Sequence, residues 1–129
     1  MINSNMIKIL EVKVVNGVPT VDDVSISPSA LPHLIVWHLV DAAGWFETLD
    51  FDPQDPPPEG IFGHFHACGK TPWAVMTDTH RGRDPVHDPV HTWSYTLKMN
   101  LAGKEVPVRS SPRPRPRPGG GANPNIKNN

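Results

Sequence analysis

The sequence predicts an all-β protein in which two antiparallel sheets pack face to face as a single sandwich. Short segments rich in β-branched and aromatic residues alternate apolar with polar side chains, as strands with one buried face do. Gly, Pro, Asn and Asp residues separate these segments at short intervals. Helices are not expected to contribute, so the strands must build the core by packing one sheet on another.

Residues 34–51 form the stretch around which the other strands are expected to pack. Ile35, Trp37 and Leu39 alternate along it, and Gly44-Trp45-Phe46 follows a short turn, which predicts a buried central strand with its hairpin partner. The alternative is an amphipathic helix, whose spacing also relates Leu31, Leu34, Ile35, His38, Leu39 and Ala42. The run Ile35-Val36-Trp37 favours the strand, because such side chains lose rotamer freedom in a helix.

Alternation elsewhere predicts strands over residues 7–15, 18–21, 24–27, 61–68, 73–77 and 91–99. Asn16-Gly17 suits a tight turn with positive φ, so the first two of these segments should form a hairpin. The last segment is the clearest, because its four large side chains share one face: Trp93, Tyr95, Leu97 and Met99. Residues 50–59 contain four prolines and should form an exposed, extended loop.

Charge divides the chain into a body and a tail. Residues 1–108 carry seven Lys or Arg against thirteen Asp or Glu, a net charge of −6, whereas residues 109–129 carry five bases and no acid. We expect one sandwich domain over residues 1–108, followed by a Pro/Arg/Gly-rich tail over residues 109–129 that is disordered. Its alternating Pro-Arg repeat favours polyproline II.

Several features indicate a cytoplasmic protein without a membrane segment. Cys68 is the single cysteine and cannot form an intramolecular disulfide. Residues 1–6 lack the basic start and apolar run of a secretory signal. No apolar run approaches the roughly 20 residues that cross a bilayer. The acidic body also argues against nucleic-acid binding by the domain itself.

The sharpest chemical pattern is the run His64-x-His66-x-Cys68. On a strand these three donors share one face, which raises the possibility of a Zn or Cu site. Neighbours along a strand face are too far apart to converge on one ion, so another segment would have to help, and the sequence offers His80, His87 and His91. The simpler interpretation is favoured, in which the opposite face packs on the core while both histidines face water.

Catalysis is not predicted, since neither a nucleophile elbow nor a Gly-rich phosphate loop is present. The carboxylates of Asp50, Asp52 and Asp55 do not follow the ligand series of a calcium loop. We therefore expect a non-catalytic binding or accessory module for a protein partner or for self-association. Metal binding is the alternative function. No cofactor other than this Zn or Cu ion is expected.

The tail suggests a second alternative, in which Arg113, Arg115 and Arg117 contact an anionic partner or nucleic acid weakly. A charged linker is the favoured interpretation of this repeat. The basic tail could also lie on the acidic body of its own or a neighbouring subunit, a contact that salt would weaken.

Four short motifs carry a resemblance: Ile35-x-Trp37-x-Leu39, Trp45-Phe46, Tyr95-x-Leu97 and the terminal Asn123-Pro-x-Ile-x-Asn128. In these the chain resembles small bacterial proteins of uncharacterised function that have immunoglobulin-like or cupredoxin-like sandwiches and often end in Asp-Pro-x-Ile-x-Asn. The resemblance implies that sandwich type and no particular chemistry. This chain departs from the pattern in having Asn at position 123 and a Pro-Arg insert before the closing motif.

Overall fold

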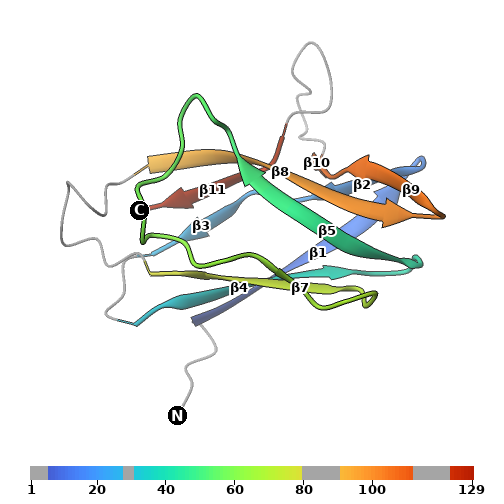
Figure 1. Ribbon diagram of the computed structural model, residues 1–129, viewed down its shortest axis with the longest axis horizontal. Coiled ribbons are helices and arrows are strands. Elements are labelled where there is room, and N and C mark those ends of the chain that lie inside the picture. The colour runs from blue at the N-terminus through green and yellow to red at the C-terminus, as the bar shows by residue number, and fades with distance from the viewer. Residues whose placement is uncertain (1–5, 28–30, 80–90, 112–122) are drawn as a thin grey trace.

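The computed structural model describes residues 6–27, 31–79, 91–111 and 123–129, and these form an all-β structure without an α-helix (Figure 1). The strands are β1 (Ile7–Val15), β2 (Val18–Val21), β3 (Val24–Ile26), β4 (His33–Leu39), β5 (Gly44–Phe51), β6 (His66–Ala67), β7 (Trp73–Asp78), β8 (His91–Leu101), β9 (Lys104–Pro107), β10 (Arg109–Ser110) and β11 (Asn125–Asn128). The all-β prediction is confirmed, and the helical alternative for residues 31–42 is wrong.

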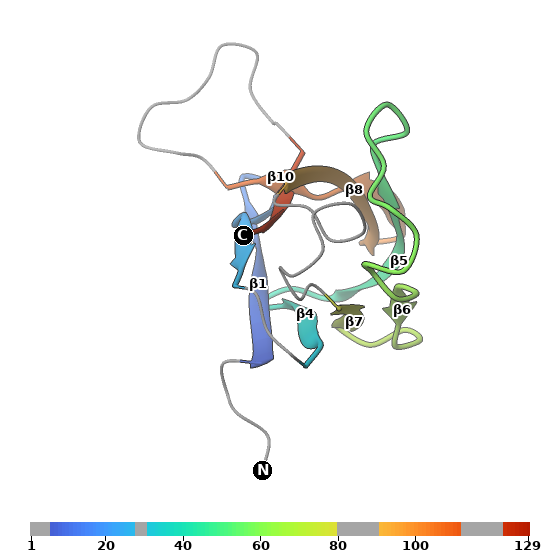
Figure 2. The same cartoon turned by 90° about the vertical axis from the view of Figure 1, so that its left-hand side faces the viewer.

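These strands form two sheets that share one core. The first sheet has the order β10-β2-β1-β4-β7-β6, and the second has the order β3-β11-β8-β5, with β9 also pairing with β8. Seen from the end, β8 lies across the core from β4 and β7 (Figure 2). Buried side chains from both sheets form a continuous apolar cluster, which is the arrangement expected of two packed sheets.

The sheets are mixed rather than antiparallel, which corrects one part of the predicted fold. β1 runs parallel to β4, β10 parallel to β2, and β11 parallel to β3. Parallel neighbours need a crossover connection instead of a hairpin. The chain supplies such crossovers by leaving the first sheet after β2, forming β3 in the second, and returning as β4 beside β1.

The central position of β4 is confirmed, but its predicted hairpin partner is wrong. β4 lies between β1 and β7, whereas β5 pairs with β8 in the other sheet. Between them the chain turns at Asp41, which has a positive φ of 55°, and enters β5 at Gly44. A Cβ at Gly44 would collide with the backbone oxygen of Asn100. Turn geometry therefore carries the chain across the core instead of back along β4.

The predicted hairpin of β1 and β2 is confirmed. Asn16 and Gly17 at its turn have φ values of 52° and 80°. These positive values are what a type I′ turn demands, and Asn-Gly tolerates them better than other residue pairs.

Part of the predicted disordered tail belongs to the two sheets. β10 pairs with β2, and β11 lies between β8 and β3, so the domain does not end at residue 108. The side chains of Ile126 and Asn128 are fully buried. Composition does not indicate the strand β11, because a single apolar residue surrounded by Asn and Lys contributes little to the hydropathy of the tail. The Pro-Arg repeat itself lies outside the described residues.

A hydrogen bond between two aromatic side chains joins the sheets at the centre of the core. The indole Nε1–H of Trp37 on β4 donates to the hydroxyl oxygen of Tyr95 on β8 over 3.1 Å. The two rings meet edge to face, and Phe65 packs against Trp37 in the same way. Burial raises the pKa of Tyr95 well above its usual range, so the phenol stays neutral inside the protein.

Tyr95→Phe should lower the free energy of unfolding by about 1–3 kcal/mol, because it leaves the buried N–H of Trp37 without its acceptor. Urea denaturation at neutral pH measures this loss. Since the pKa of Tyr95 is raised on folding, the wild type should also lose stability as the pH rises above about 10, the pKa of an unfolded tyrosine. The phenylalanine variant should lose less over that range. Wild-type stability in Tyr95→Phe would contradict this role.

Candidate functional site

The segment with the His-x-His-x-Cys pattern is not the continuous strand that alternation predicts. Within residues 61–68 only β6 is a strand, preceded by an isolated bridge between Phe62 and Asp78. Gly63 explains the close approach at this point, because a Cβ there would collide with the side-chain oxygen of Thr77. Strand pairing with β7 is interrupted between Gly63 and β6, so this segment pairs with β7 over only part of its length.

The side chains of this segment nevertheless divide as the simpler interpretation predicts. Ile61 is buried, Phe65 and Ala67 pack partly against the core, and His64 and His66 are exposed. Cys68 is half-buried. Among the described residues no three His, Cys, Asp or Glu side chains are grouped so that they could hold a metal ion. The structure thus does not gather the predicted ligands His64, His66 and Cys68, and His80 and His87 lie outside the described part.

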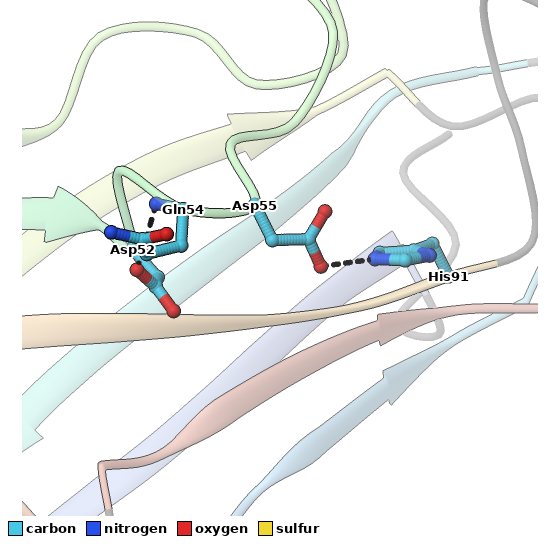
Figure 3. Close-up of polar contacts among 4 residues, drawn as sticks. All are labelled: Asp52, Gln54, Asp55 and His91. Atoms are coloured by element: carbon cyan, nitrogen blue, oxygen red, sulfur yellow. Dashed lines mark hydrogen bonds and ion pairs between the residues drawn. The ribbon is translucent and has the colours of Figure 1, made fainter.

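A pair of polar side chains ties the proline-rich loop to the start of β8. The carboxylate of Asp55 lies 2.6 Å from Nε2 of His91, and both side chains remain substantially exposed (Figure 3). The carboxylate of Asp52 instead accepts a hydrogen bond from the backbone N–H of Gln54. The carboxylates of Asp52 and Asp55 therefore serve separate local contacts.

A second polar pair is fully buried and links the two sheets. The side-chain amide of Asn128 on β11 donates to the carboxylate of Asp78 on β7 over 3.1 Å. Buried His33 on β4 stands directly opposite Asp78 in the strand register. Sequence reasoning missed this pair, although Asn128 closes the terminal Asn123-Pro-x-Ile-x-Asn128 motif. A buried carboxylate with an amide donor fastens β11 to the opposite sheet.

The outer face of the first sheet carries an apolar surface that we call the outer patch: Ile9, Leu34, Val36, His38, Trp73 and Val75. Its centre is a cross-strand row in which Ile9, Val36 and Val75 stand side by side on β1, β4 and β7. Ile9 is 59% exposed and Trp73 is 40% exposed. Val36 is only 8% exposed, because its neighbours cover it.

An aromatic pair forms one border of the outer patch. The imidazole of His38 and the indole of Trp73 stack in parallel, with ring centroids 3.7 Å apart and planes at 7°. Glu11 stands beside His38 in the same cross-strand row. The stack favours one orientation of the indole, and the side chain of Trp73 stays 40% exposed.

The outer patch is unusual for a sheet face with no described element packed over it. Residues on a solvent-facing sheet side normally alternate along each strand with buried residues, and their side chains are polar. On β4 both faces are apolar, since Leu34 and Val36 point outward while Ile35 and Trp37 point into the core. Sequence reasoning missed the patch, although the unbroken run Leu34-Ile35-Val36-Trp37 contained the signal. A strand that is apolar on both faces is typical of one covered on both sides.

Comparisons with protein-family models and with curated proteins give no match to this chain. Within the described residues there is no helix with the length and hydrophobicity required to span a membrane. The predicted tail residues Arg113, Arg115 and Arg117 lie outside the described part of the chain.

Proposed function

We propose that the protein is a non-catalytic binding module and that it binds through the outer patch. The observation that supports this proposal is the apolar cross-strand row on β1, β4 and β7, which leaves Ile9 exposed and has the stacked His38–Trp73 pair at its border. Exposed apolar surface of this kind marks interaction sites in proteins that are otherwise polar outside. A catalytic alternative has no comparable support, since the described polar pairs each satisfy a local structural contact.

The chemistry of the outer patch suits another protein surface. Aliphatic side chains form its centre, an aromatic pair and Glu11 lie at its border, and charged residues are missing from the middle. This is the usual composition of a protein–protein interface, in which tryptophan is prominent among the residues that contribute most to affinity. We propose a second copy of this chain as the partner, because a two-fold contact would cover both outer patches at once.

The distribution of charge favours this orientation of two copies. Six acidic residues lie in the turn before β5, in β5 itself or in the loop that follows: Asp41, Glu47, Asp50, Asp52, Asp55 and Glu59. β5 belongs to the second sheet, whereas the outer patch lies on the first, and the turn and the loop flank β5 in the chain. Contact through the outer patch would keep the acidic segments of the two copies apart, and their repulsion would be reduced accordingly.

Sedimentation velocity over a wide concentration range tests the proposal. The wild type should dimerise in the micromolar range. Ile9→Lys combined with Trp73→Lys should weaken dimerisation by about tenfold or more, because two charges would enter the contact. The matched control is Val15→Lys with Val18→Lys, whose side chains are 45% and 43% exposed at the β1–β2 hairpin. A wild type that stays monomeric throughout, or equal weakening by both pairs, would count against the proposal.

We place the protein in the cytoplasm and assign its sandwich to the immunoglobulin-like or cupredoxin-like type, as further parts of this proposal. The lone cysteine supports the location, and the four short motifs support the fold type. Metal binding through His64, His66 and Cys68 and nucleic-acid contact through the basic tail stay predictions, since no described geometry favours either one.

A further inference from the structure

The outer face of the second sheet is polar, in contrast to the outer patch on the first sheet. Along β8 the odd-numbered residues 93–99 are buried in the core, whereas the residues between them point outward: Ser94, Thr96 and Lys98. Asp50 of β5 stands directly opposite Thr96 in the antiparallel register. Residues opposite each other point to the same face, so this carboxylate and this hydroxyl lie side by side on the surface.

This face is hollowed where β5 ends. A pocket of about 410 Å³, which we call the polar pocket, is lined there by Asp50, Phe51, Pro53, Ser94, Thr96 and Asn123 among others. Pockets that bind small molecules have volumes of about 300–1,000 Å³. The polar pocket therefore has room for a small ligand.

Hydrogen bonds hold the proline-rich wall of the polar pocket in place. The backbone N–H of Asp52 donates to the carbonyl of Ser94, which extends the pairing of β5 with β8 beyond the strand. The carboxylate of Asp52 accepts from the backbone N–H of Gln54. Two residues further on, Asp55 contacts His91 at the start of β8. This wall is thus attached to β8 at two points.

Asn123 forms the opposite wall. Its side-chain oxygen accepts a hydrogen bond of 3.4 Å from the guanidinium of Arg109. The carbonyl of the next residue, Pro124, accepts from the backbone N–H of Tyr95 on β8. Asn123 is therefore held beside β8 from two directions. An Asn side chain whose oxygen accepts still has two N–H groups with which to donate to a ligand.

The polar side chains between these walls have unused hydrogen-bonding capacity. Asp50, Ser94 and Thr96 make no side-chain hydrogen bond within the part of the chain that the structure describes. A hydroxyl group donates one hydrogen bond and accepts two, whereas a carboxylate only accepts. These groups stand about 5 Å apart across the strands and about 7 Å apart along β8. A ligand with several donors and acceptors could engage them together.

The mixture of charges in the polar pocket selects against charged ligands. The carboxylates of Asp50 and Asp52 repel an anion such as phosphate. The ammonium group of Lys98, which also lies 3.8 Å from Glu105, opposes a cation. We propose that the polar pocket binds a neutral saccharide, because sugar hydroxyls donate and accept hydrogen bonds as the groups of the pocket do.

Apolar surface in the polar pocket fits the same class of ligand. Pro53 is exposed and Phe51 is half-buried at the lining. A sugar ring presents C–H groups on its faces and hydroxyl groups around its rim. Binding sites for such molecules combine apolar surface with a few placed polar groups. This site is separate from the outer patch, because the two lie on different sheets.

An NMR titration of the full-length protein tests this proposal with four neutral tetrasaccharides: maltotetraose, cellotetraose, mannotetraose and tetra-N-acetylchitotetraose. At least one of them should shift the amide signals of Asp50, Ser94 and Thr96, with a Kd of about 1 mM or lower. Amide signals of β1 and β4 should not move, because these strands belong to the other sheet. The absence of shifts around the polar pocket with all four sugars would overturn the proposal.

Two substitutions test the contacts themselves. Thr96→Val keeps the shape of the side chain and removes its hydroxyl, and Asp50→Ala removes the carboxylate. Each should weaken saccharide binding by about tenfold. The matched control is Thr92→Val, the same change on the same strand at a position opposite Lys127. Equal affinities of Thr96→Val and Thr92→Val would contradict the assigned site. Unchanged signals of Leu97 in the core show that each variant is folded.

A diamine and added salt separate a saccharide site from a cation site. Saccharide binding should persist in about 0.5 M NaCl, because the ligand carries no charge to be screened. Loss of saccharide binding in salt would count against neutral hydrogen bonding. Putrescine should leave the signals of Asp50 and Thr96 unchanged. Shifts caused by putrescine and by none of the sugars would show that the carboxylates bind cations, and the proposal would be wrong.

Discussion

Deletion of residues 123–129 is expected to abolish cooperative folding. This segment contains β11, which lies between β3 and β8 and completes the second sheet. Its removal would leave two strand edges unpaired and would take the buried Ile126 and Asn128 out of the core. Urea denaturation followed by tryptophan fluorescence should show a sigmoidal transition for the full chain and none for the truncated one.

The control for this deletion is a change within the same tail that spares β11. Replacing Arg113, Arg115 and Arg117 by Ser removes the basic character of the repeat, and the unfolding midpoint should stay close to that of the wild type. A truncated protein that still unfolds cooperatively at the wild-type midpoint would show that β11 is dispensable. Residues 123–129 would then be separable from the rest of the domain.

Trp37→Ala is expected to have the largest effect of any single substitution, a loss of about 3–5 kcal/mol in the free energy of unfolding. Trp37 is completely buried on the central strand β4 and contacts the rings of Phe65 and Tyr95. The substitution removes these contacts together with the hydrogen bond to Tyr95, and it leaves a cavity between the sheets. Since domains of this size have only about 5–15 kcal/mol in total, thermal unfolding should begin near ambient temperature.

Trp73→Ala is the matched control for this substitution. Trp73 stands opposite His38 on the neighbouring strand β7, but its side chain lies on the outer patch and is 40% exposed. Its loss should cost less than about 1 kcal/mol, chiefly from the stack with His38. Similar losses of stability for the two alanine variants would mean that the assignment of inner and outer faces on the first sheet is wrong.

Self-association through the outer patch depends on side chains such as Ile9 and Trp73, so lysine substitutions test it. The contact would also cover the apolar outer face of β1, which would otherwise invite aggregation.

The sequence predicts less of the candidate site than of the fold. Alternation correctly separated the water-facing His64 and His66 from the core-facing Ile61 and Phe65, because that separation depends only on local chain geometry. The pairing of Asp78 with Asn128 joins residues 50 positions apart, and nothing local indicates it. The apolar run on β4 indicates the outer patch. Its extent depends on β1 and β7, which lie on either side of β4, and no local pattern predicts these neighbours.

The sequence by itself determined where strands form, for β1, β2, β4, β7 and β8 in particular, and which side chains face the core on β4 and β8. These properties follow from alternation, turn residues and side-chain shape, all of which act over a few neighbouring residues. Only the tertiary structure decided which strands pair. It sent β5 away from β4, set β1 and β4 parallel, and brought β11 into the second sheet across the Pro-Arg repeat. The physical reason is that pairing depends on how the whole core is enclosed, and a terminal segment gains its stability from partners that are distant in the chain.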